Sequence, residues 1–171
     1  MNTQQYQQQA KRTCASLGRH ELDLSHMALG LNSEIVELDE AINNKDFVNI
    51  KEEIGDCFFY LINTFYFLNV EATNMSYLIP VGDDHVKQLY NLVSEYQNDL
   101  KRHIAYGKGL KTVNLNQVQM KLMEIVTLYD FDLTEILDKN IAKLKKRFPD
   151  KFTQDKAINR DTNAERKILE E

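Results

Sequence analysis

Apolar residues recur at every third or fourth position along most of this 171-residue chain, the spacing that places them on one face of an α-helix. The two clearest stripes lie in residues 23–43 and 47–69. Their apolar members are Leu31, Ile35, Leu38 and Ile42 in the first segment and Ile54, Leu61, Phe65 and Leu68 in the second. Both segments are therefore predicted to be amphipathic helices that bury their apolar faces in a common core.

Further helices complete the predicted fold. We expect them at residues 84–106, 114–129 and 133–148, the last stopped by Pro149, together with a short polar helix from residue 2 to about 18 that ends at Gly18. The chain contains only 6 Gly and 2 Pro, which is few for a loop-rich or multi-stranded protein. The prediction is an all-α helical bundle with a four-helix core. It forms a single domain over residues 1–171, with a break at 73–84 and a C-terminal tail at 149–171.

Net charge, cysteine content and hydropathy indicate which partners and which compartment to expect. The formal net charge of -5 argues against nucleic acid as a partner, because nucleic-acid binders usually carry a clustered basic excess. Cys14 and Cys57 are too few for a disulfide framework, which favours a reducing compartment. No apolar stretch approaches membrane-spanning length, and the first residues lack the features of a signal peptide. We expect a cytoplasmic protein with no membrane partner.

Two acidic pairs, Glu34/Glu37 and Glu53/Asp56, are the most informative polar residues. Residues three apart share a helix face, so two neighbouring helices could direct four carboxylates at one centre and hold hard cations there. Small residues beside the first pair, such as Gly30, would leave room for a ligand. Acidic pairs of this spacing are also common on solvated helix faces, so the sequence pattern alone leaves both readings open.

Four motifs of the chain belong together. They are Tyr6-Gln7-x-x-Ala10-x-Arg12-Thr13, then Ala28-Leu29-Gly30-Leu31-x-Ser33-Glu34-x-x-Glu37, then Glu53-x-x-Asp56 followed by Tyr60, and finally Asn140-Ile141-x-Lys143-Leu144-x-x-Arg147-Phe148-Pro149-x-x-Phe152 with Ile158-Asn159-Arg160 after it. In these motifs the chain resembles the MazG-like, all-α nucleoside triphosphate pyrophosphohydrolases. The resemblance covers most of the chain except roughly residues 70 to 90. One departure stands out, because Ser33 occupies a place where the family usually has a glutamate.

The resemblance implies hydrolysis of an NTP or dNTP to the monophosphate and pyrophosphate. The cofactor would be Mg²⁺, with Mn²⁺ as an alternative, and the implied metal ligands are Glu34, Glu37, Glu53 and Asp56. Glu34 and Glu53 are the expected catalytic carboxylates, and Glu34 is the one expected to orient or deprotonate the attacking water. A homodimer or higher homo-oligomer is also implied.

Basic and aromatic positions would hold the substrate. The resemblance places Lys143 and Arg147 at phosphate oxygens, with Lys146 and Arg160 as weaker candidates, whereas cations near a helix C-terminus can also simply complement its dipole. On the second acidic helix, Tyr60 and Asn63 could contact the base or the sugar. A tyrosine at such a position is more often a core ring with its hydroxyl at the edge. A ligand role for His26 is disfavoured, because histidine is a poor partner for Mg²⁺.

The helix pair at 23–74 has a second copy at 84–138 if the chain is read with an offset of 61 residues. This register sets Ser33-Glu34 on Ser94-Glu95, but it replaces three of the carboxylates by Asn98, Asn114 and Gln117. An unrelated helical insertion is the alternative to such a degenerate repeat.

Two competing functions remain at this stage. The first is a non-catalytic helical module that binds nucleotide or protein and retains a vestigial metal site, a reading favoured by Ser33 and by the neutral second copy. The second is a phosphoribosyl-ATP pyrophosphohydrolase, although both ends of the chain look closer to the MazG-like group.

Overall fold

A computed structural model describes residues 1–74 and 78–170, and within that part of the chain all regular secondary structure is helical. The elements are α1 (Thr3–Ala10), a 3-10 helix η1 (Lys11–Thr13), α2 (His20–Asn44), α3 (Phe47–Phe67), α4 (His85–Tyr106), α5 (Val113–Leu128), α6 (Leu133–Arg147), α7 (Gln154–Ile158) and α8 (Thr162–Glu170). The all-α prediction is confirmed.

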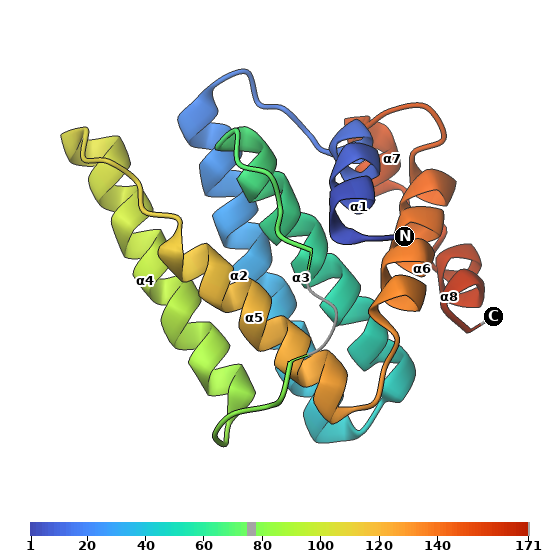
Figure 1. The fold of residues 1–171 in the computed structure, drawn as a ribbon. Coiled ribbons are helices and arrows are strands. Elements are labelled where there is room, and N and C mark those ends of the chain that lie inside the picture. Colours follow the sequence, from blue (N-terminus) through green and yellow to red (C-terminus); the bar gives the residue numbers. More distant parts are fainter. Residues whose placement is uncertain (75–77, 171) are drawn as a thin grey trace.

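Helix α3 is the centre of the arrangement. It packs lengthwise on α2, and the pair α4–α5 covers one side of these two helices (Figure 1). On the other side lie α1 and α6, and α8 packs on the outside of α6. Phe58, Leu61, Ile62 and Phe65 of α3 are completely buried, and each such side chain stabilises the fold by about 1.5–3 kcal/mol relative to an exposed position.

A two-residue link sets the relation between α2 and α3. Lys45 adopts the left-handed conformation at the end of α2 (φ 57°), and its amide donates to the Ala41 and Ile42 carbonyl groups. Asp46 follows as the N-cap of α3, where its side chain accepts a hydrogen bond from the Asn49 amide at 3.1 Å. So short a connection makes the two helices antiparallel neighbours, and this brings their acidic positions together.

The helix boundaries agree with the sequence expectations in the middle of the chain and differ at both ends. The predicted helix at 2–18 is wrong beyond residue 13, because the chain turns extended at Cys14 and Gly18 has a φ of 78°. The tail at 149–171 contains two helices that the apolar pattern did not predict, α7 and α8. Within the predicted break at 73–84, residues 75–77 lie outside the described part of the chain.

The cysteines and the hydropathy of the helices were also considered in the sequence. Cys14 and Cys57 are free thiols, and Cys57 is buried in the core. None of the helices in residues 1–74 and 78–170 is long and apolar enough to cross a membrane.

Candidate metal centre and its basic wall

Three glutamates converge where α2 and α3 face each other. Glu34 and Glu37 lie one turn apart on α2, and Glu53 projects from α3. One carboxylate oxygen from each side chain lies within 4.8 Å of the other two. Glu53 is buried and only 4% exposed, Glu34 is half-buried and Glu37 is exposed, so the cluster opens toward solvent on the α2 side.

The electrostatics of this cluster are unfavourable without a cation. Burial, Asp56 and Glu34 raise the pKa of Glu53 to about 9. Burial, Asp56 and Glu37 raise the pKa of Glu34 to about 7. Among the described residues no basic side chain forms an ion pair with these three glutamates, and one buried oxygen of Glu53 has no hydrogen-bond partner.

This donor set fits a hard divalent cation. Mg²⁺ and Mn²⁺ bind carboxylate oxygens, and a cation would remove the repulsion that raises both pKa values. The unpartnered oxygen of Glu53 would gain a ligand in the same step. Among residues 1–74 and 78–170, Glu34, Glu37 and Glu53 are therefore the residues best placed to hold a metal ion.

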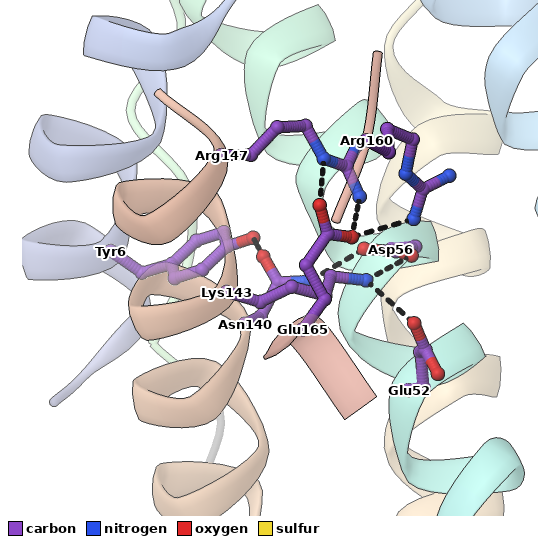
Figure 2. A network of polar contacts seen from close by, with 8 residues as sticks. All are labelled: Tyr6, Glu52, Asp56, Asn140, Lys143, Arg147, Arg160 and Glu165. Atoms are coloured by element: carbon purple, nitrogen blue, oxygen red, sulfur yellow. Dashed lines mark hydrogen bonds and ion pairs between the residues drawn. The ribbon is translucent and has the colours of Figure 1, made fainter. Parts of the chain in front are cut away.

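Asp56, the fourth predicted ligand, is not among the three converging glutamates, and its carboxylate has partners on α6 (Figure 2). Its Oδ1 accepts from Asn140 Nδ2 at 2.6 Å, and its Oδ2 accepts from Lys143 Nζ at 2.5 Å. The amide of Asn140 is held in turn by Tyr6, whose hydroxyl donates to Asn140 Oδ1 at 2.6 Å. In this arrangement Asp56 connects the acidic cluster to α6, and its role as a metal ligand stays a prediction.

Lys143 is completely buried, and its ammonium faces two carboxylates of α3. Besides Asp56 it donates to Glu52 Oε1 at 3.1 Å. Burial alone would lower the pKa of this amine, but Asp56 and Glu52 outweigh that effect and raise it. The contacts of Lys143 in the structure are therefore acidic side chains of the same chain, and a direct phosphate contact is a prediction beyond them.

A cleft of about 360 Å³ opens beside the acidic cluster. Its acidic wall contains Glu34, Glu37, Glu52, Glu53 and Asp56, and its basic wall contains Arg147 and Arg160. The lining also includes His26, Phe59, Tyr60, Phe148 and Phe152 with several smaller residues. One cleft thus combines carboxylates for a metal, cations for an anion and aromatic rings for an apolar or planar group.

The basic wall is organised by Glu165 from α8, which is 3% exposed. Arg147 donates from Nε to Glu165 Oε1 at 2.9 Å and from Nη2 to Oε2 at 2.5 Å, in a bidentate pair. Arg160 donates to the same Oε2 at 2.8 Å. Burial would raise the pKa of Glu165, but these two guanidinium groups hold it below its usual range.

Tyr60 lies against the backbone of α2. A Cβ on Gly30 would come within 2.1 Å of the Tyr60 ring, so only glycine permits this contact. The expectation that Gly30 leaves room for a ligand is wrong, because the ring fills that space. His26 contacts the same ring edge-on, with the centroids 6.0 Å apart.

Asn63 lies deeper than the sequence suggested. It is completely buried, its Nδ2 donates to the Phe59 carbonyl at 2.9 Å, and it is absent from the lining of the cleft. Its contact with a base or sugar remains a prediction that this arrangement does not favour.

Sequence reasoning missed the phenylalanines of the cleft and three polar residues of the site, Asn140, Glu52 and Glu165. Asn140 is the first residue of the motif that contains Lys143. The two are three residues apart and share one face of the helix, so this spacing could have indicated Asn140 as a site residue. Glu52 precedes Glu53 but lies outside the Glu53-x-x-Asp56 motif, so the motif did not indicate it. Glu165 lies in a segment with few apolar residues, and nothing in its spacing indicates a partner.

Comparison with known proteins identifies the segment that carries the cluster. Residues 23–73, which contain α2 and α3, match the family model of the MazG nucleotide pyrophosphohydrolase domain. The resemblance inferred from the motifs is thereby confirmed. No curated protein and no solved structure matches the chain.

Proposed function

We propose that this chain, whose residues 23–73 carry the MazG nucleotide pyrophosphohydrolase domain, hydrolyses a nucleoside triphosphate to the monophosphate and pyrophosphate with the help of a divalent cation. One observation carries the proposal. Three carboxylates without a basic partner in the described residues share a cleft with two arginines, so the cleft offers separate places for a metal and for phosphate oxygens.

Glu34, Glu37 and Glu53 would hold the cation, Mg²⁺ or Mn²⁺. Once bound, the metal supplies charge neutralisation for the phosphate chain and lowers the pKa of a bound water. Without such a cation the carboxylates would repel the triphosphate.

The remaining steps belong to side chains of this protein. Arg147 and Arg160 bind phosphate oxygens and offset the charge of the leaving pyrophosphate. Glu34 is the carboxylate that orients the attacking water or accepts a proton from it. Phe59, Tyr60, Phe148 and Phe152 provide an apolar wall on which a nucleoside can pack.

Ser33 is compatible with this assignment. Its hydroxyl donates to the Gly30 carbonyl at 2.8 Å, within its own helix, and it is not part of the glutamate cluster. The serine therefore reduces the number of acidic groups near the site and leaves the three converging glutamates in place.

A turnover screen tests the proposal. The purified chain is incubated with canonical and modified NTPs and dNTPs in Mg²⁺ or Mn²⁺, and monophosphate, pyrophosphate and inorganic phosphate are measured separately. We expect equal amounts of monophosphate and pyrophosphate, and a loss of at least about 100-fold in kcat for Glu53→Gln. Glu95→Gln, which removes an exposed carboxylate from α4, is the matched control and should retain activity.

Two results would contradict the assignment. Release of inorganic phosphate would mean that a different bond is cleaved, and full activity in Glu53→Gln would mean that chemistry occurs elsewhere.

The replacement at Ser33 also motivates a second candidate, a helical module that binds nucleotide without hydrolysing it. Calorimetry separates the two functions. Binding of a nucleotide in Mg²⁺ and in Mn²⁺ with no product over the whole panel would favour the module.

A further inference from the structure

The basic wall of the cleft depends on a residue more than a hundred positions away from the acidic motif. We infer that Glu165 is a positioning residue for substrate binding: it holds Arg147 and Arg160 side by side as one phosphate-binding unit. This inference rests on the proposed function, because it assigns a task to the side of the cleft that would meet the triphosphate.

The geometry shows how one carboxylate orders two cations. Glu165 Oε1 and Oε2 both bind Arg147, and Oε2 also binds Arg160, so the two guanidinium groups meet at one oxygen (Figure 2). Without an anion between them, two guanidinium groups this close repel each other. Glu165 therefore stabilises a pair of arginines that would otherwise move apart into solvent.

Both arginines keep N–H donors that no described residue engages. A guanidinium has five N–H groups, and Glu165 engages only Nε and Nη2 of Arg147 and only Nη2 of Arg160. Both residues also line the cleft that contains the glutamate cluster. The trio of one carboxylate and two guanidiniums keeps a net positive charge, as a phosphate site requires.

Independent contacts of α8 indicate that Glu165 is a fixed part of the wall and not a mobile competitor of phosphate. Leu169, one turn further along, is buried, and its carbonyl accepts from Lys139 Nζ at 3.1 Å. On the same helix, Arg166 lies 3.8 Å from Asp46 at the start of α3. The helix is thus attached to α6 and α3 whether or not Glu165 is present.

The test compares Glu165→Gln with Glu170→Gln, which removes an exposed carboxylate from the same helix that contacts only Arg166 among the described partners. Pre-ordered arginines contribute to binding, so we expect Glu165→Gln to raise KM by about tenfold while kcat stays within about twofold. Calorimetry with inorganic pyrophosphate should show a similar loss of affinity. Glu170→Gln should match the wild type in both measurements.

Two further variants make the inference specific. Adding Glu165→Gln to Arg147→Gln should raise KM less than it does in the wild type, because the carboxylate acts through the arginine. Glu165→Asp keeps the charge but shortens the reach, so its KM should lie between those of wild type and Glu165→Gln. Thermal unfolding confirms that each variant is folded, and Glu165→Asp carries the test if Glu165→Gln is not.

The outcomes are distinguishable. Unchanged KM and pyrophosphate affinity in Glu165→Gln would overturn the positioning role, and increased affinity would overturn it by showing that the carboxylate competes with phosphate. Absence of pyrophosphate release by the wild type would instead sink the proposed function, and the pyrophosphate titration would still report on Glu165.

Discussion

The helix pair α2–α3 and the helix pair α4–α5 bury side chains at corresponding positions but carry different groups on their polar faces. Shifted by 61 residues, the end of α3 at Phe67 falls on the end of α5 at Leu128. Ile54, Cys57 and Leu61 fall on Leu115, Val118 and Leu122, and all six are completely buried. The helices thus agree with a degenerate repeat, which remains a prediction.

The polar faces differ in how charge is balanced. In α4–α5, the buried Lys121 and Glu124 form an ion pair within one helix, and the adjoining cleft is lined by the amides of Gln88, Asn91 and Gln117. In α2–α3, no basic side chain of the described residues pairs with Glu34, Glu37 or Glu53, and the buried Lys143 that pairs with Glu52 and Asp56 comes from α6. The helix pair α4–α5 thus balances this buried charge within one helix, whereas the glutamate cluster of α2–α3 could balance its charge by holding a cation.

The largest change in stability is expected when a buried lysine is removed, either Lys143, which pairs with α3, or Lys121 of α5. Lys143→Met should lower the free energy of unfolding by about 3 kcal/mol, because Asp56 and Glu52 lose their shared cation. Lys121→Met should cost about 1–2 kcal/mol, since His85 Nδ1 lies 3.2 Å from Glu124 and can replace part of the contact. Urea denaturation measures both. Equal stability losses would show that the two lysines have equivalent roles.

The second largest effect is expected in the pH dependence of stability, which should come from the glutamates of α2–α3 and not from α4–α5. The folded pKa values of Glu34 and Glu53, about 7 and about 9, lie above the ordinary carboxyl value of 4.5. The folded state therefore binds more protons than the unfolded state over this range. The stabilisation is complete below about pH 4.5 and is lost as pH rises through 7 and then 9. Without metal, we expect urea midpoints to fall from pH 5 to pH 9.

Two variants assign this slope to the acidic cluster. Glu53→Gln should flatten it, and Glu95→Gln on α4 should leave it unchanged. Saturating Mg²⁺ should also flatten it, because the cation takes the place of the protons. Midpoints that rise between pH 5 and pH 9 would contradict the raised pKa values.

The smallest effect on stability is expected at the contact between Gly30 and Tyr60. In Gly30→Ala the new methyl group pushes the Tyr60 ring toward the cleft, and the ring is half-buried, so the cost should be about 1 kcal/mol. Asn91→Ala, the aligned position in α4, should change stability by less than about 0.5 kcal/mol. Urea denaturation gives both values, and KM reports whether the displaced ring obstructs the substrate. An unchanged KM in Gly30→Ala would mean that Tyr60 lies outside the substrate path.

The sequence predicted the long helices well because their apolar stripes are regular. The stripe through Leu31, Ile35 and Leu38 belongs to a helix whose core face is continuous, so period and burial agree. The acidic positions were predictable for a similar reason, because a spacing of three residues places Glu34 and Glu37 on one helix face. Their convergence with Glu53 was predictable because the short link between α2 and α3 makes the two helices neighbours.

Contacts between distant helices could not be predicted in this way. The partners of Lys143 depend on how α6 crosses α3, where Gly55 lets the Asn140 side chain approach to about 3.0 Å from the position of a Cβ. The tail was missed because α7 has no buried residue and α8 is held by Leu169 and the ion pairs of Glu165. Helical periodicity carries no information about such single contacts.

The separation between Asp56 and Lys143 along the chain has a consequence for folding kinetics. The glutamate cluster assembles from two helices joined by a short turn, a local event that is fast. The buried Lys143, which pairs with Asp56 beside this cluster, comes from 87 residues further along, through a long-range contact that forms later. Partly folded molecules therefore hold Asp56 and Glu52 without their shared cation, and dissolved salt should slow the final step by screening the attraction between these carboxylates and Lys143.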